Sequence, residues 1–363
     1  MSWSAQQDGA LKAVADWLRR GEPQVFRLFG YAGTGKTTLA RHVAEGIEGE
    51  VVFGAYTGKA ALVLRSKGCH DASTIHSLIY RSRETEEGGP AFVLNRSSPA
   101  AKADLIVIDE CSMVDEDLGR DLLSFDKPVL VLGDPAQLPP VKGGGFFTEA
   151  EPDVMLTEVH RQAADNPIIR LSLAVREGAP LQPGTYGESR VIRRREIKPE
   201  TVLEADQVLV GLNKTRRLYN GRIRELLGYR DPMPAVKEKL VCLRNDKTKG
   251  LLNGGTWTIE TLRPATEGVV RMDVLPEEEG RRKSVEVSVL KAFFEGREEE
   301  IPFPLRRETD EFTYGYALTV HKAQGSQWDD LVLFDESFAF REHRARWLYT
   351  ALTRAAKTVT VAV

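Results

Sequence analysis

The stretch G-Y-A-G-T-G-K-T, residues 30–37, tells us most about the fold of this chain. It has the pattern G-x-x-x-x-G-K-T, follows the apolar run 25–29 and precedes a helical pattern at 38–45. A strand, a glycine-rich loop and a helix in this order let backbone N–H groups and the positive end of a helix dipole face phosphate oxygens. The stretch therefore predicts a phosphate-binding loop. A glycine-rich turn that binds no nucleotide is the weaker interpretation.

Each residue type in this loop has an expected task. Glycines adopt backbone conformations that a Cβ forbids, so successive N–H groups can point inward. A lysine at the start of the helix can reach the β and γ phosphates, and the hydroxyl after it can ligate Mg²⁺. The expected nucleotide contacts are Gly30, Gly33, Thr34, Gly35, Lys36, Thr37 and Thr38, with Thr37 as a metal ligand.

Length and composition describe a globular protein of several domains. Its 363 residues are too many for one ordinary core, and 42% apolar with 28% charged residues is typical of globular chains. No apolar run approaches the ~20 residues that span a membrane, and the start of the chain lacks a signal-peptide profile. Three widely spaced cysteines favour a reducing, cytoplasmic location. At a net charge of −3, nucleic acid would have to be held in a local groove.

Short apolar runs that end in polar residues predict parallel sheets with ligand sites at their carboxyl edges. Two sets of such runs alternate with helical patterns and predict an α/β fold. The first set is 51–55, 105–108 and 129–132, and the second is 207–212, 313–317, 331–334 and 358–363. Residues 238–305 instead carry short β-rich runs and the turn 253–255, which predicts a small inserted β-barrel. Residues 81–99 predict a short hairpin on the first domain.

Two strand ends carry groups suited to the hydrolysis of a nucleoside triphosphate. Asp109 is expected to bind the metal and Glu110 to activate water. The stretch G-D-P-A-Q-L-P-P-V, residues 133–141, places Gln137 where it could sense the γ-phosphate, although a proline-ordered turn explains the same residues. The acidic runs 277–279 and 298–300 are expected to be solvated loops.

With five further motifs, the chain resembles the superfamily 1 helicases of the RecD-like group, whose members run 5′ to 3′. The resemblance covers nearly the whole chain, and the motifs fall in the family's order. The additional motifs are T-G-K-A-A (57–61), S-T-I-H (73–76), L-T-E-V-H-R-Q (156–162), A-L-T-V-H-K-A-Q-G-S (317–326) and Y-T-A-L-T-R-A (349–355), beside 30–37, D-E-C-S-M-V (109–114) and 133–141.

The resemblance implies two RecA-like domains facing each other across an ATP cleft, with an SH3-like barrel inserted in the second. The implied bounds are 1–160, then 161–237 with 306–363, and 238–305 for the barrel. The implied activity is ATP-dependent 5′-to-3′ translocation on single-stranded DNA with duplex unwinding. The implied cofactors are ATP and Mg²⁺, and the implied partners are single-stranded and tailed duplex DNA. A monomer that could meet replication or repair proteins is expected.

The resemblance also assigns roles at the nucleotide. Gln7 matches an adenine-reading glutamine, although a solvated glutamine would give the same pattern. Arg161 and Arg354 match two catalytic arginines that reach the γ-phosphate, with surface salt bridges as the alternative. His160 matches a ring that stacks on adenine, or is a packed histidine. The family commonly has Glu where this chain has Gln327, so the contact with the ribose loses its charge.

The residues expected to grip the strand are hydroxyls, histidines and lysines suited to phosphates. Each of them could instead be a helix cap or a core polar residue. They are Thr57, Lys59, Thr74 and His76 on the first domain, and Thr319, His321 and Lys322 on the second. Phe92, in the predicted hairpin, is expected to be the strand-separating wedge unless it packs back onto the domain.

Two other functions fit the same motifs. Grip on a phosphate backbone does not exclude RNA, because the 2′-OH is the group that discriminates. A non-translocating P-loop ATPase that acts as a switch on a protein partner is the second alternative, which the two arginines disfavour.

Overall fold

The computed structural model describes residues 3–84, 90–139, 145–159, 166–246, 248–264, 268–277 and 283–363. The chain divides into two compact units, Met1–Glu177 and Gly178–Val363. Each unit contains a largely parallel α/β sheet, which confirms the predicted fold class. The predicted domain bounds stay a prediction. Among the described residues, no helix is both long and apolar enough to span a bilayer.

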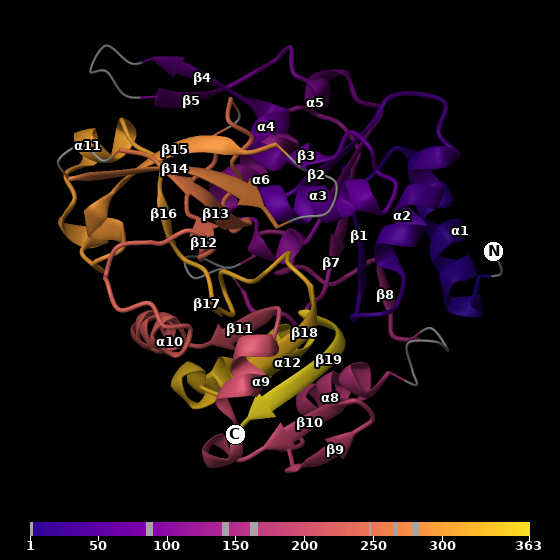
Figure 1. Cartoon of the computed structure of the whole chain (residues 1–363). Coiled ribbons are helices and arrows are strands. Elements are labelled where there is room, and N and C mark those ends of the chain that lie inside the picture. Colours follow the sequence, from indigo (N-terminus) through magenta and orange to yellow (C-terminus); the bar gives the residue numbers. More distant parts are fainter. Residues whose placement is uncertain are drawn as a thin grey trace. The chain divides into compact units, whose positions relative to one another are not determined.

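The first unit is built on a six-stranded sheet in the order β3-β2-β6-β7-β1-β8, and every pairing in it is parallel. Figure 1 draws this unit in indigo to magenta. Its strands are β1 (Val25–Gly30), β2 (Val51–Ala55), β3 (Ser73–Thr74), β6 (Leu105–Asp109), β7 (Val129–Gly133) and β8 (Val154–Leu156). Its helices are α1 (Ala5–Arg20), α2 (Lys36–Glu45), α3 (Gly58–Ser66), α4 (Ile75–Ile79), α5 (Pro99–Lys102), α6 (Glu116–Leu123) and α8 (Pro167–Arg176).

Alternate residues of these strands face two separate cores, as expected of a sheet buried on both sides. Along β6, Leu105 and Val107 pack with α1, α2 and α3, whereas Ile106 and Ile108 pack with α4, α5 and α6. Because β1, β6 and β7 run parallel, their carboxyl ends meet at one edge of the sheet. The phosphate-loop residues, Asp109 and Gln137 all lie at the ends of these three strands or in the loops that follow them.

An antiparallel pair, β4 (Tyr80–Glu84) and β5 (Pro90–Leu94), lies within the stretch where a hairpin is predicted. It follows α4 directly and belongs to neither large sheet.

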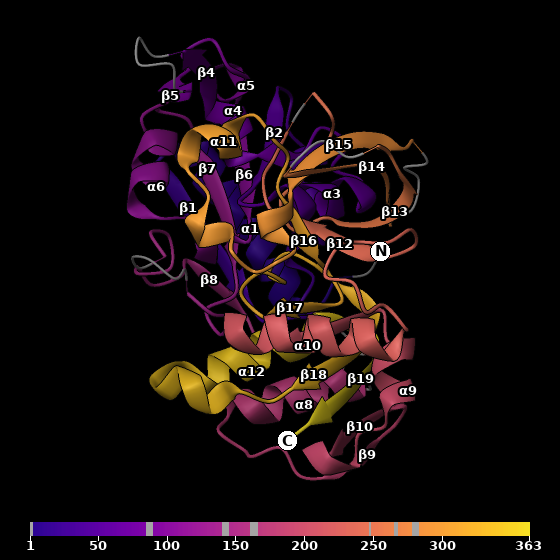
Figure 2. The ribbon, with the colours of Figure 1, turned by 60° about the vertical axis from the view of Figure 1, so that its left-hand side comes forward.

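The second unit contains a sheet in the order β17-β11-β18-β19-β10-β9, antiparallel only between β9 and β10. Helix α10 lies along this sheet, with Ile223 packed against Val208 and Val332 (Figure 2). The elements are β9 (Gly184–Tyr186), β10 (Ser189–Ile192), α9 (Pro199–Glu204), β11 (Gln207–Val210), α10 (Asn213–Leu226), β17 (Ala317–Thr319), β18 (Trp328–Phe334), α12 (Arg344–Leu352) and β19 (Ala355–Ala362).

A five-stranded antiparallel sheet in the order β15-β14-β13-β12-β16 is inserted between α10 and β17. A bridge between Val289 and Asp310 brings its two edge strands together, around a core that includes Trp257 and Phe312. That this sheet is SH3-like stays a prediction. The elements are β12 (Lys239–Cys242), β13 (Thr256–Leu262), β14 (Val269–Pro276), β15 (Val285–Leu290), α11 (Phe303–Arg307) and β16 (Phe312–Tyr314).

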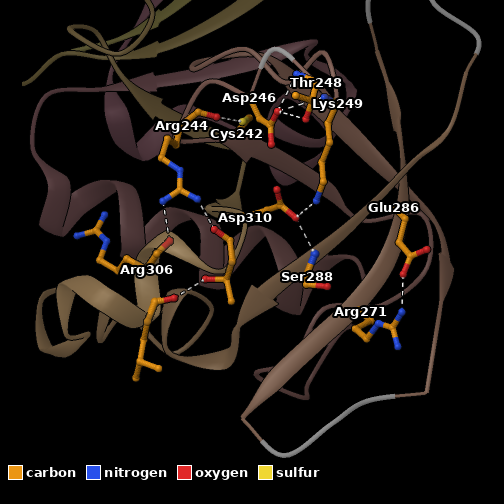
Figure 3. Close-up of polar contacts among 12 residues, drawn as sticks. Cys242, Arg244, Asp246, Thr248, Lys249, Arg271, Glu286, Ser288, Arg306 and Asp310 are labelled. Atoms are coloured by element: carbon orange, nitrogen blue, oxygen red, sulfur yellow. Dashed lines mark hydrogen bonds and ion pairs between the residues drawn. The ribbon is translucent and has the colours of Figure 1, made fainter. Parts of the chain in front are cut away.

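Ion pairs and hydrogen bonds fasten the ends of this small sheet (Figure 3). Lys249 Nζ lies 2.7 Å from Asp310 Oδ2, which also accepts from the backbone N–H of Ser288 at 2.9 Å. Arg244 donates to the carbonyl of Arg306 at 2.6 Å. These contacts hold the loop after β12 against the segment before β16.

The small sheet joins the α/β sheet at a short and heavily bonded junction. The single strand predicted at 313–317 is in fact two, because β16 belongs to the small sheet and β17 to the large one. Only Gly315 and Tyr316 separate them, and Gln207 Nε2 donates to both of their carbonyls, at 3.0 and 2.9 Å.

The junction is also closely packed. A Cβ on Gly315 would lie 2.7 Å from the backbone of Leu240, so only glycine fits. Arg224 and Glu238 add a buried ion pair of 2.7 Å beside the junction.

Candidate nucleotide and strand sites

The loop between β1 and α2 has the backbone that its glycines predict. Gly33 and Gly35 have φ of 79° and 84°, a region that side chains with a Cβ rarely adopt. Gly30 is needed for a different reason, because a Cβ there would lie 2.6 Å from Thr34 Oγ1 and 2.7 Å from Leu156 Cβ. Glycine is thus favoured at all three positions, by backbone conformation at Gly33 and Gly35 and by lack of space at Gly30.

Lys36, the first residue of α2, folds its ammonium over the loop. Its Nζ donates to the backbone carbonyls of Gly30 at 2.5 Å and Tyr31 at 3.1 Å. Charged phosphate oxygens are stronger acceptors than carbonyls, so an anion in the loop would compete well for these donors. The side chain is therefore held in the loop and ready to bind phosphate.

Thr37 and Asp109 meet where α2 begins and β6 ends. Thr37 Oγ1 donates to Asp109 Oδ2 at 3.0 Å, and the N–H of Glu110 donates to Asp109 Oδ1 at 2.8 Å. Burial, and then the charge of Glu110, raise the pKa of Asp109. A bound cation would oppose both effects and favour the carboxylate.

Glu110 has a left-handed backbone, with φ 53° and ψ 43°. Few residues other than glycine adopt this conformation, and it costs of order 1–3 kcal/mol, so it is typical of functional sites. It turns the chain sharply after Asp109, the last residue of β6, so Glu110 does not continue the alternation of the strand. Nothing in the sequence pattern predicts this turn.

Gln137 lies after β7 and is 8% exposed. Its Oε1 is buried and has no hydrogen-bond partner among the described residues. A buried acceptor without a donor costs about 1–3 kcal/mol, so it is either a defect or a group reserved for a ligand. The last two residues of the 133–141 stretch lie outside the described residues.

Gln7 is buried against the phosphate loop, so it is not a solvated glutamine. Its Nε2 donates to the carbonyl of Thr34 at 3.1 Å. Its Oε1 accepts from the N–H of Ser4 at 3.1 Å, which completes a capping box at the start of α1. The structure therefore brings Gln7 to the loop, as an adenine-reading residue requires.

His160 and Arg161 lie outside the described residues, but both flanks of their segment are anchored near the loop. On one side, the N–H groups of Thr157 and Glu158 donate to Gln6 Oε1 at 2.8 and 2.9 Å. On the other side, the Arg176 guanidinium lies 3.6 Å from the centre of the Tyr31 ring. No motif pointed to Gln6 or Arg176, since the S-x-x-Q pattern indicates only Gln7.

Arg354 belongs to the second unit, at the end of α12, and is buried. Its Nε donates to the carbonyl of Thr350 at 3.1 Å and its Nη1 to the carbonyl of Ser326 at 3.3 Å. Its Nη2 donates to the Thr353 hydroxyl at 3.2 Å. No carboxylate of the described chain pairs with it, so its charge is not neutralised there and a surface salt bridge is excluded. Gln327 is exposed, two residues after Gly325.

On the first unit, the predicted strand-gripping hydroxyls cap helices. Thr57 Oγ1 accepts from the N–H of Ala60 at the start of α3, at 3.1 Å. Thr74 Oγ1 accepts from the N–H of Ser77 at the start of α4, at 3.2 Å. Lys59 is buried in the first turn of α3. The capping interpretation therefore holds for both threonines, whether or not they also bind a strand.

Two aromatic residues of the first unit are open to solvent. Phe92 on β5 is 65% exposed, so it is not packed into the core. Its ring lies 6.3 Å from His76, which is also exposed, and 6.2 Å from Tyr80. These three rings form a loose cluster at the base of the β4–β5 pair, where an exposed base could stack.

On the second unit, the residues predicted to grip the nucleic-acid strand lie at the end of β17 and directly after it. Thr319 Oγ1 accepts from the N–H of Lys322 at 3.3 Å. Lys322 Nζ donates to Asn253 Oδ1, in a loop of the small sheet, at 2.5 Å, and burial lowers the pKa of this lysine. His321 is half-buried beside Phe340, and burial lowers its pKa as well. These three residues thus lie where the two sheets of this unit meet.

Comparison with known proteins identifies the family. A family model described as an AAA domain matches residues 3–195, more than half of the chain, and one described as a UvrD-like helicase C-terminal domain matches residues 314–362. The ATP-dependent RecD2 DNA helicase of Deinococcus radiodurans is 32% identical over an alignment of 366 positions, which covers 90% of this chain and 45% of that protein. The ATP-dependent DNA helicase Pif1 of Bdellovibrio bacteriovorus is 28% identical, over 90% of this chain and 81% of its own length. The chain thus spans less than half of the RecD2 relative.

Solved structures show the same fold. The crystal structure of Pif1 helicase from Candida albicans matches with a TM-score of 0.58 at 17% identity, over 100% of this chain and 94% of that one. That of Bacteroides Pif1 bound to single-stranded DNA gives 0.57 at 19% identity, over 99% and 92%. With the family models and the order of the motifs, these matches confirm the resemblance predicted from the sequence. This chain belongs to the superfamily 1 helicases of the RecD and Pif1 type.

Proposed function

We propose that this chain is an ATP-dependent DNA helicase that moves 5′ to 3′ along single-stranded DNA and unwinds duplex. One observation carries the proposal: the Thr37 hydroxyl and the Asp109 carboxylate lie 3.0 Å apart beside the phosphate loop, with Glu110 turned out of the strand next to them. This is the arrangement that triphosphate hydrolysis requires. The motifs of the second unit then favour a motor on nucleic acid over a simple switch.

The oxygens of Thr37 and Asp109 fit Mg²⁺. This ion takes hard oxygen ligands, usually one or two from protein, and completes its shell with phosphates and water. Among the described residues, no group of three or more His, Cys, Asp or Glu side chains could hold a metal. When bound, the ion would neutralise charge on the phosphates.

The chain's own residues supply the remaining chemistry. Lys36 exchanges its carbonyl partners for the outer phosphates and stabilises the charge that develops on them. Glu110 accepts the proton of the attacking water, and the unpaired Oε1 of Gln137 offers that water a second acceptor.

The remaining predicted residues bind the rest of the nucleotide. Gln7 and His160 bind the adenine, and Gln327 faces the sugar. Arg161 and Arg354 reach the γ-phosphate when the two RecA-like domains close.

Translocation follows from alternating grip. ATP binding closes the domains and hydrolysis opens them, and the difference in strand affinity between the two states limits the work of each step. The protein acts as a monomer in the cytoplasm on single-stranded and tailed duplex DNA. Replication or repair proteins are its expected partners.

The deciding experiment compares ATPase rates without nucleic acid, with single-stranded DNA and with RNA of the same sequence. Strong stimulation by DNA supports the proposal. Equal or greater stimulation by RNA would favour the RNA helicase alternative, and no stimulation by either would favour the P-loop switch.

Polarity needs a separate measurement. A duplex with a 5′ single-stranded tail should be unwound efficiently and the same duplex with a 3′ tail poorly. Efficient unwinding of the 3′-tailed substrate would show that the proposed direction is wrong.

A further inference from the structure

A cavity of about 330 Å³ lies in the second unit, where the first turn of α10, strand β12 of the small sheet and the end of β17 with the residues after it meet. Val241, Leu243 and Leu318 supply its apolar part. Among the described residues that line it, none is acidic. Its polar lining consists of Asn213, Arg216, Thr319, His321 and Lys322.

Arg216 is the least satisfied of these groups. Its side chain is only 12% exposed, and its Nε is buried with no hydrogen-bond partner among the described residues. Burial lowers the pKa of the guanidinium, which shows how poorly the charge is solvated. A buried guanidinium normally has most of its five donors paired. The Arg216 guanidinium instead has at least one unpaired N–H donor, on Nε, and it lies beside a cavity.

The nearest carboxylate, Glu298, compensates Arg216 only loosely. Its Oε1 lies 3.8 Å from Arg216 Nη2, too far for a hydrogen bond, and instead accepts from Arg217 Nη2 at 2.9 Å. Its Oε2 is buried without a partner in the described part of the chain. The run 298–300 is therefore not simply a solvated loop, because Glu298 is shared between two arginines.

The other titratable residues that line the cavity supply no negative charge to compensate Arg216. Lys322 Nζ is bonded to a neutral amide oxygen, that of Asn253, so its charge is also uncompensated by that contact. His321 adds a ring that can donate a hydrogen bond. Two cations, an amide and a hydroxyl around one small cavity call for an anion with several acceptor oxygens. Phosphate oxygens match the forked guanidinium better than the edge of a nucleobase does.

We propose that this cavity is a phosphate subsite for the nucleic-acid strand, with Arg216 as its main ligand and Glu298 as the internal carboxylate that competes for it. The inference rests on the proposed function and adds to it a residue that no motif assigns. A backbone phosphate that enters the cavity gives Arg216 the hydrogen bonds it lacks. Glu298 then remains with Arg217, with which it already forms a hydrogen bond.

The test measures the affinity for a fluorescent single-stranded oligothymidylate at several salt concentrations. Arg216→Gln should weaken binding roughly tenfold at low salt, the value of one charged hydrogen-bonding contact. It should also reduce the slope of log affinity against log salt by about 1. Arg216→Lys should retain most of that slope while losing affinity, because it keeps the charge and loses the fork.

Two matched variants separate this role from a structural ion pair. Arg217→Gln removes the neighbouring arginine, which shares Glu298 but does not line the cavity, and should leave affinity within about twofold. Glu298→Gln should tighten strand binding, because it removes the competitor. If Arg216→Gln and Glu298→Gln instead weaken binding alike, or if Arg216→Gln changes neither affinity nor salt slope, the proposal is wrong. Melting temperatures of all variants check the fold.

A second arm distinguishes a strand phosphate from free phosphate. Inorganic phosphate, added at constant ionic strength, should raise the melting temperature of the unmodified protein more than that of Arg216→Gln and should compete with the oligonucleotide. Stabilisation by phosphate without any effect of Arg216→Gln on strand binding would identify a free-phosphate site and overturn the assignment to the strand. If the unmodified protein bound no strand at all, the proposed function itself would fail, whatever the phosphate arm showed.

Discussion

The nucleotide edge of the first sheet and the two threonines predicted to grip the strand, Thr57 and Thr74, differ in what their side chains bond to. At the nucleotide edge, Thr37 bonds to the carboxylate of Asp109, and Gln137 leaves an acceptor unpaired. Thr57 and Thr74 instead cap helices, and each cap stabilises the fold by ~1 kcal/mol. Substitutions at the nucleotide edge should therefore report on activity alone, whereas those at the threonines mix activity with stability. Four predictions test this contrast.

Lys36→Ala should abolish ATPase activity and change the melting temperature little. The lysine supplies charge stabilisation in the transition state, and within the described residues its ammonium bonds to carbonyls of its own loop. Steady-state ATPase and circular dichroism measure the two effects. Full turnover by a folded variant would contradict the assignment of the loop, and loss of the fold would contradict the contrast drawn above.

Glu110→Gln should still bind ATP with Mg²⁺ but hydrolyse it ~10²–10⁴-fold more slowly, the usual contribution of a general base. Single-turnover hydrolysis and the binding of a fluorescent nucleotide separate the two steps. Asp109→Asn serves as the companion variant, because loss of a metal ligand should weaken Mg²⁺-dependent binding itself. If Glu110→Gln lost nucleotide binding instead, the two carboxylates would have exchanged roles.

Phe92→Ala should slow the unwinding of a 5′-tailed duplex several-fold, since stacking on a base contributes ~1–3 kcal/mol. Strand-stimulated ATPase and stability should hardly change, because the ring is already exposed. Phe338→Ala is the matched control, with a phenylalanine that is 67% exposed on the second unit. A parallel fall of unwinding and ATPase would show that Phe92 is structural, and no change would place the wedge elsewhere.

Thr74→Ala should lower the free energy of unfolding by ~1 kcal/mol through loss of the α4 cap, and should weaken strand binding modestly. Thr74→Ser keeps the hydroxyl and should restore both. Urea denaturation and oligonucleotide titration provide the two readouts. Restored stability without restored binding would mean that the methyl group, and not the hydroxyl, faces the strand.

Much of this molecule could be predicted from local patterns, because strand ends and glycine-rich loops are local features. The carboxyl ends of β1, β6 and β7 were recognisable as such, and the first-unit sheet brings the residues after them to one edge. The left-handed turn at Glu110 could not be predicted, because a pattern of residue types does not specify the backbone of a single non-glycine residue. The ion pairs of Glu298 with Arg216 and Arg217 could not be predicted either, because these residues are far apart in the sequence and meet only in the folded chain.

The same limit applies to the run 313–317. Its residues T-Y-G-Y-A have the composition of one strand, and no local signal divides them between two sheets. The division is imposed by tertiary pairing, β16 with β12 and β17 with β11. Glycine at 315 is explained only by the backbone of Leu240 across from it.

This short junction has a mechanical consequence. A flexible linker would let the small sheet lag behind the large one, because such a chain absorbs displacement before it transmits force. Gly315 and Tyr316, whose carbonyls both accept from Gln207, form a connection too short and too constrained to absorb such a displacement. The second unit should therefore behave as one stiff lever, so that a rotation of its α/β sheet carries the small sheet through the same angle.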